Sequence, residues 1–115
     1  MKLTLKHLNE FKEEFEKWQM EFGLLEYRPT FKLCDLPEAY AEIAINEEGK
    51  VCTVSLGSFV GKNDIDGRDI GKSAKHECIH LLLYRLVWLS QKRHIREGEV
   101  EDEWEKVTRV LERIL

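Results

Sequence analysis

The sequence contains little of what marks disordered, fibrous or disulfide-stabilised chains. Only two of its 115 residues are proline and seven are glycine, and 43% are hydrophobic, which is typical of an ordered globular protein. Its three cysteines (Cys34, Cys52 and Cys78) are odd in number and lack CxxC spacing, so they indicate neither a disulfide framework nor a cysteine zinc site. A chain of this length predicts one small domain spanning residues 1–115.

Excess positive charge and long apolar runs are also missing. The net charge of −4 gives the surface no positive field for phosphate groups, so nucleic acid is not an expected partner. The longest apolar stretch, residues 81–89, is interrupted by Arg85 and is far shorter than the roughly 20 residues that span a bilayer. No secretory signal is visible. We therefore expect a cytoplasmic protein without a membrane partner, and the oligomeric state stays open.

Hydrophobic spacing predicts an α+β fold. Apolar residues recur at helical steps before Gly23, and the period changes to two between residues 24 and 58, which predicts a helix followed by three strands. The turn sequence Asn46-Glu47-Glu48-Gly49 separates the last two strands, which should pair as an antiparallel hairpin. We expect a small, mainly antiparallel three-stranded sheet, with Pro29 placing the first strand at an edge.

Two more helices are expected after the sheet. Residues 69–92 contain no strong helix breaker, and their apolar residues cover more than one face, as in a helix packed on several sides. Gly98 precedes a last helix, whose apolar side should consist of Trp104, Val107, Leu111, Ile114 and Leu115.

The central predicted helix carries the HExxH pattern, with His76, Glu77 and His80. At about 100° per residue, the two histidines lie one above the other. Their stripe continues through Leu83 and Val87, so we expect both imidazoles to point into the core. Buried imidazoles without partners would be costly, and a shared Zn²⁺ would remove that cost.

Glu77 lies about 100° round the helix from His76, beside the histidine stripe rather than in it. A carboxylate in that position can accept a proton from water that a metal activates, without itself becoming a ligand. The pattern therefore predicts zinc-dependent hydrolysis of a peptide or amide bond, with Glu77 as the catalytic base.

On this motif, the sequence resembles the zincin metallopeptidases, in particular very small members often encoded by phages. In those proteins an HExxH helix follows a short sheet and precedes a helix of the form E-x-x-V-x-R-x-L-E. The stretch EKVTRVLE, residues 105–112, is similar, with Thr108 where a valine is common. The resemblance implies a minimal zincin-like domain that cleaves a protein or peptide substrate.

The resemblance to the glutamate zincins also implies a third zinc ligand, a glutamate on the last helix. Glu105 is the preferred residue because it aligns with the family-like pattern. Glu101 is kept as an alternative that could otherwise support a histidine from the outer shell, and Glu103 comes third.

Three hypotheses remain open at this point. The first is a zinc-dependent peptidase with a restricted protein substrate, since so short a chain leaves little mass for a deep cleft. The second is a zincin-like binding or scaffold protein whose metal site is structural or weak. The third is an α+β domain in which the HExxH pattern is coincidental and the histidines bond to the backbone instead.

Overall fold

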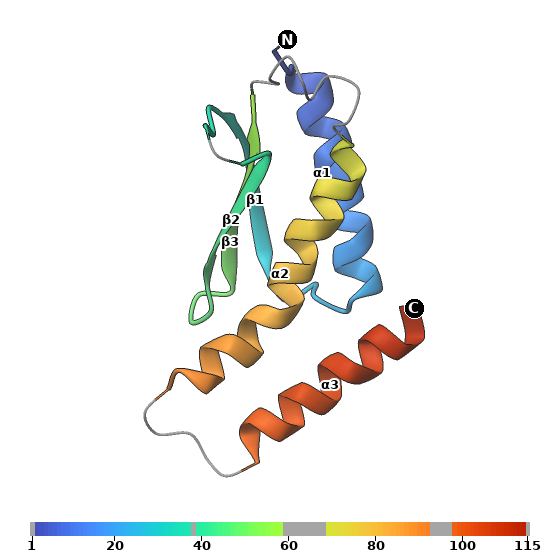
Figure 1. Cartoon of the computed structure of the whole chain (residues 1–115), viewed down its shortest axis with the longest axis vertical. Coiled ribbons are helices and arrows are strands. Elements are labelled where there is room, and N and C mark those ends of the chain that lie inside the picture. The colour runs from blue at the N-terminus through green and yellow to red at the C-terminus, as the bar shows by residue number, and fades with distance from the viewer. Residues whose placement is uncertain (1, 38, 59–68, 93–97, 115) are drawn as a thin grey trace.

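A computed structural model describes residues 2–37, 39–58, 69–92 and 98–114. Three helices and one three-stranded sheet make up this part of the chain, which confirms the α+β class. In chain order they are α1 (Leu5–Glu21), β1 (Arg28–Cys34), β2 (Ala41–Asn46), β3 (Val51–Gly57), α2 (Ile70–Ser90) and α3 (Glu99–Ile114). Helices α1 and α2 lie side by side next to the sheet, and α3 lies beside the C-terminal half of α2 (Figure 1).

The helix boundaries follow local signals in the sequence. Helix α1 ends just before Gly23, whose φ of 72° is in the left-handed region that glycine adopts without steric cost. Helix α2 begins after Asp69, whose side chain accepts a hydrogen bond from the backbone N–H of Lys72 at 3.0 Å. Both boundaries agree with the predicted elements.

The sheet is mixed, so the expected mainly antiparallel arrangement is wrong in part. Strands β2 and β3 form the predicted antiparallel hairpin, but β1 pairs with β3 in parallel, and the strand order is β1-β3-β2. Burial accounts for the strand order, because β3 is the most buried strand and takes the centre, while β1 and β2 largely alternate between half-buried and exposed residues. Pro29 lies in the edge strand β1, as predicted.

The hydrophobic core lies between the sheet and the α1–α2 pair. Phe15 of α1 packs edge-to-face on Phe31 of β1, with ring centroids 5.4 Å apart. Val54 and Leu56 of β3 are completely buried, as is Cys78 of α2. These contacts fix α2 against the sheet, and they decide which of its faces stays open to solvent.

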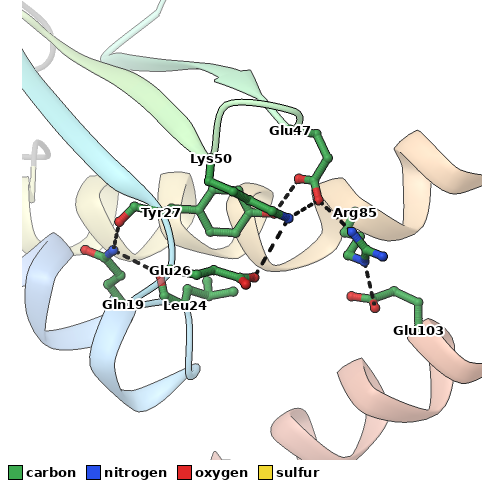
Figure 2. A network of polar contacts seen from close by, with 8 residues as sticks. All are labelled: Gln19, Leu24, Glu26, Tyr27, Glu47, Lys50, Arg85 and Glu103. Atoms are coloured by element: carbon green, nitrogen blue, oxygen red, sulfur yellow. Dashed lines mark hydrogen bonds and ion pairs between the residues drawn. The ribbon is translucent and has the colours of Figure 1, made fainter.

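A buried carboxylate joins the hairpin turn to α2. The Glu47 side chain is 2% exposed; it accepts hydrogen bonds from the Tyr27 hydroxyl, from the Lys50 ammonium and from Nη1 of Arg85, the last at 2.9 Å (Figure 2). Arg85 Nε also lies 3.4 Å from Oε2 of Glu103 on α3. The turn, α2 and α3 are therefore tied together by one guanidinium.

Hydrogen bonds to Glu47 determine its charge state. Burial by itself would raise the pKa of the Glu47 carboxyl, but the hydrogen bonds from Lys50, Tyr27 and Arg85 outweigh it and hold that pKa below its ordinary value. Burial, and then the hydrogen bond to Glu47, raise the pKa of Tyr27. Glu47 is thus ionised and Tyr27 is neutral throughout the physiological range.

The apolar side of α3 is as expected at Val107, Leu111 and Ile114, which belong to the core or pack against it, but differs at Trp104; Leu115 lies outside the described residues. Trp104 is 63% exposed, whereas Val107, Val110 and Glu103 are buried. Helix α3 is rotated toward Arg85, because the Arg85–Glu103 ion pair and the two valines occupy the contact with α2 and the core. The expectation that Trp104 packs inward is therefore wrong. At the far end of α3, Arg113 donates a hydrogen bond to the Glu21 carbonyl at 2.9 Å.

In the described part of the chain, no helix is both long and apolar enough to cross a bilayer.

Candidate metal centre

The HExxH residues lie on the first half of α2, on the side next to β2. His76 and His80 are both exposed, so the expectation that both imidazoles point into the core is wrong. The stripe that they begin continues through half-buried Leu83 to Val87, which is 47% exposed. It faces a groove beside the sheet edge rather than the core, because the short sheet covers only the neighbouring face of α2.

The two imidazoles nevertheless converge. Their Nε2 atoms are 3.2 Å apart, and the rings meet edge-to-face with centroids 4.8 Å apart. Two nitrogens at about 2.0–2.1 Å from a tetrahedral Zn²⁺ would lie roughly 3.3 Å apart. The histidine pair therefore has the separation that a shared zinc ion requires, and the same separation also allows one Nε2–H to bond to the other ring nitrogen.

Glu77 differs from its two histidine neighbours in being buried. Glu77 is 6% exposed, and it lines the groove between β2 and α2 together with His76 and His80. Burial raises the pKa of its carboxyl, nearby Glu42 adds to the rise, and His76 and His80 oppose it. A carboxylate held in a dry position beside the imidazole pair is suited to exchanging protons with a bound water.

Two adjoining cavities form the groove between β2 and α2, and both are lined by Ala41, His76 and Glu77. The cavity toward the start of α2, about 420 Å³, is lined by Asp69, Lys72 and Ser73 together with Ala39 and Tyr40. The other cavity, about 570 Å³, has mainly apolar walls (Ile43, Ile45, Leu83, Tyr84 and Val87). His76 and Glu77 thus lie where the two cavities meet, and His80 lines the second cavity alone.

The acids of α3 are not brought to the histidines. Helix α3 contacts the side of α2 that carries Arg85, which at about 100° per residue is 140–180° round the helix from the two histidines. Glu105 is exposed, and its Oε1 accepts a hydrogen bond from Arg109 at 3.2 Å. Glu101 is exposed and Glu103 is paired with Arg85. Within the described ranges, no three His, Cys, Asp or Glu residues are gathered at metal-binding distance.

One acid from another element does line the groove, namely Glu42 of the edge strand β2. The sequence does not single it out, because nothing in an alternating strand indicates which residue will lie beside a distant helix. Glu42 is exposed, so its side chain can change rotamer without disturbing the core. Glu105, by contrast, could reach the histidines only if α3 left its packed position.

The cysteines are not part of this site. Burial raises the pKa of Cys52 to about 11, and burial together with neighbouring Cys52 raises that of Cys78 to about 12. Because a thiol must lose its proton to bind zinc, both are poor ligands. Their burial agrees with the sequence interpretation of Cys52 and Cys78 as small core residues; Cys34 is half-buried.

Comparisons with known proteins add no relative: no family model matches the chain, and no curated protein or solved structure matches it either.

Proposed function

We propose that the protein is a zinc-dependent metallopeptidase in which His76 and His80 hold Zn²⁺ and Glu77 is the catalytic base. The observation that carries the proposal is the 3.2 Å separation of the two Nε2 atoms, which fits a pair of zinc ligands. The zincin resemblance of the HECIH sequence points the same way. The substrate would be a protein or peptide, because the site is an open groove along a sheet edge rather than an enclosed pocket.

The chain's residues have distinct roles in this mechanism. Bound zinc would supply a nucleophile at neutral pH by lowering the pKa of water. Glu77 would accept the proton from the attacking water and then donate it to the leaving amine of the cleaved bond. Glu77 is buried while the histidines are exposed. The proton taken from water would therefore be held on the side of the site that faces the protein interior. A substrate would reach the histidines from solvent.

Two residues are candidates for the third protein ligand of the zinc ion. The zincin resemblance predicts Glu105, whereas the groove offers Glu42. The position of α3 favours Glu42, because Glu42 lines the groove that holds the histidines, whereas α3 packs on the opposite side of α2. Glu42→Ala should then weaken zinc binding about tenfold or more, as expected when a ligand or its close support is lost. Glu105→Ala should leave zinc binding unchanged. If instead Glu105→Ala weakens zinc binding and Glu42→Ala does not, Glu105 is the third ligand, as the resemblance predicts.

The decisive experiment measures zinc content and hydrolysis together, on protein purified without a histidine tag. We expect stoichiometric zinc in the wild-type protein and its loss in His80→Ala. Glu77→Gln should keep zinc and lose cleavage of an unfolded protein such as casein, while Glu48→Gln, an exposed acid in the hairpin turn, should behave as wild type. Absence of zinc from wild-type protein after zinc supplementation would contradict the proposal.

A second candidate function is a binding or scaffold domain with a weak metal site. It is favoured by one observation, that only two metal ligands converge among the described residues. In that case zinc would bind at a low affinity that neither Glu42→Ala nor Glu105→Ala changes, and no hydrolysis would accompany it. The same measurements therefore distinguish the two functions.

A further inference from the structure

Helix α3 carries the most exposed tryptophan of the chain. Trp104 is 63% exposed, whereas Trp18 and Trp88 are half-buried. A lysine ammonium lies over each of the half-buried rings: Lys75 is 4.4 Å from the ring centroid of Trp18, and Lys92 is 4.2 Å from that of Trp88. Among the described residues, no cation and no aromatic ring contacts the indole of Trp104. Its exposed indole is therefore open to a partner.

Trp104 belongs to a stripe along one border of the buried side of α3. The stripe residues recur at steps of four, four and three, so they share one face of the helix; they are Val100, Trp104, Thr108 and Leu111. All of them except Trp104 are half-buried. Helix α3 packs mainly against α2 and is the outermost helix on its side of the molecule (Figure 1). The stripe is thus a partly open helix face with a tryptophan at its centre, a residue type that is enriched in binding interfaces.

The exposed residues next to this stripe are acidic. Glu101 and Glu112 lie roughly 60° and 80° round the helix from Trp104, and neither is paired with a cation among the described residues. The helix dipole favours Glu101 in the first turn, but it disfavours Glu112 in the last turn. The basic residues of α3 lie on the opposite flank, roughly 140–180° from Trp104; they are Lys106, Arg109 and Arg113.

The Trp104 face, defined as Val100, Glu101, Trp104, Thr108, Leu111 and Glu112, is therefore apolar and negative. This charge decides which kind of partner fits. Nucleic acid and anionic lipid would be repelled by the acids. In a two-fold contact with a second copy, the same acids would lie opposite one another. A basic protein segment, by contrast, can pair with Glu101 and Glu112 and place a cation over the indole.

We propose that the Trp104 face is a docking surface for a basic amphipathic helix of another protein. Apolar residues of that helix would lie along the stripe, and its lysines or arginines would lie over the Trp104 indole and beside the two acids. A helix fits because the stripe extends for roughly 16 Å along α3, at 1.5 Å per residue. Since α3 lies on the side of α2 that carries Arg85, away from the histidine pair, the proposal does not depend on the metal site.

Peptide binding to the full chain tests this proposal. The probes are two short synthetic amphipathic peptides, one of leucine and lysine and one of leucine and glutamate. The readout is the indole N–H signal of each tryptophan in NMR spectra. The leucine–lysine peptide should shift the Trp104 signal and leave that of Trp18 in place, and its binding should weaken with added salt, which screens exposed charges. The leucine–glutamate peptide should not bind.

Variants assign the binding to this face, with affinity measured by titration calorimetry. Trp104→Ala should weaken binding of the leucine–lysine peptide at least about tenfold, as expected for the central residue of an interface. The double variant Glu101→Gln/Glu112→Gln should weaken it several-fold and reduce its salt dependence. The matched control is Glu10→Gln/Glu13→Gln, which removes two exposed acids from α1 and should bind as wild type.

Equal binding of the two peptides, wild-type affinity in Trp104→Ala, or the same loss in both double variants would each overturn the proposal. A Trp104 signal that shifts with protein concentration alone would show that a second copy covers the face instead. A shift with anionic phospholipid vesicles but not with the leucine–lysine peptide would show that a membrane does. Zinc-free protein and His76→Ala should bind the peptide as wild type does, so failure of the metal site would leave this docking surface intact.

Discussion

Glu47 and Glu48 are adjacent residues of one turn with very different environments. Glu47 is buried against Arg85, Lys50 and Tyr27, whereas Glu48 is exposed. Two neighbouring glutamates in a polar turn look alike in sequence. The one hint was Arg85, which interrupts an apolar helix and therefore needs an acidic partner. The identity of that partner came only from the fold.

Removing Glu47 should be strongly destabilising. Glu47→Ala leaves the Tyr27 hydroxyl without its acceptor and leaves Arg85 with Glu103 as its remaining acidic partner, so we expect a loss of about 3 kcal/mol in the free energy of unfolding. Glu48→Ala is the matched control and should change it by less than about 0.5 kcal/mol. Urea denaturation followed by circular dichroism measures both. Equal effects of the two substitutions would contradict the buried network.

The same carboxylate should make stability depend on pH. Because the folded-state pKa of Glu47 is lowered, its contribution is present above the unfolded value of about 4.3 and is lost as the pH falls through the folded pKa. The stability difference between wild type and Glu47→Gln should therefore shrink as the solution is acidified below about pH 4.3. Urea titrations of both proteins at a series of pH values test this. A stability difference that grows with acidification would contradict the prediction.

At the scale of the element, α3 shows how a strong helical pattern can be assigned to the wrong face. The pattern of apolar residues predicted the helix itself, and Val107 is buried as expected. The rotation of α3 about its axis was decided by the pairing of Glu103 with Arg85, which turns Trp104 outward. The same rotation and position keep Glu105 away from the histidines.

Truncations on α3 should report this rotation. Val107→Ala creates a cavity in the core and should cost about 2 kcal/mol in the free energy of unfolding. Trp104→Ala removes a larger side chain, but one that is 63% exposed, and should cost less than about 1 kcal/mol. If thermal unfolding shows the tryptophan truncation to be the more damaging, the orientation of α3 is wrong.

At the scale of the whole molecule, a metal held by the folded protein must stabilise it. His76 and His80 are close together only because α2 is helical, so zinc should bind the folded state in preference to the unfolded one. Free zinc at one hundred times its dissociation constant would add about 2.7 kcal/mol of stability. This linkage does not depend on catalysis.

The unfolding temperature should therefore rise when zinc is added to metal-free protein and should fall again when a chelator is added. At one hundred times the dissociation constant the rise should be about 10 °C, at roughly 4 °C for each kcal/mol in a domain slightly longer than 100 residues. His76→Ala should remove the effect, and His7→Ala, which changes a histidine bonded locally to Thr4, should retain it. A zinc response that persists in His76→Ala would place the metal elsewhere.

Local patterns in the sequence were enough to predict the number and type of the described elements and to find the HExxH residues. Local rules set these features: hydrophobic period, turn and cap residues, and the one-turn spacing of His76 and His80. Three features emerged only from the packing of the folded chain: β1 runs parallel to β3, the histidines face an open groove, and Glu42 rather than Glu105 lines that groove. These features depend on which faces pack together, and that is settled by contacts such as Arg85 with Glu47 and Glu103, between residues distant in sequence.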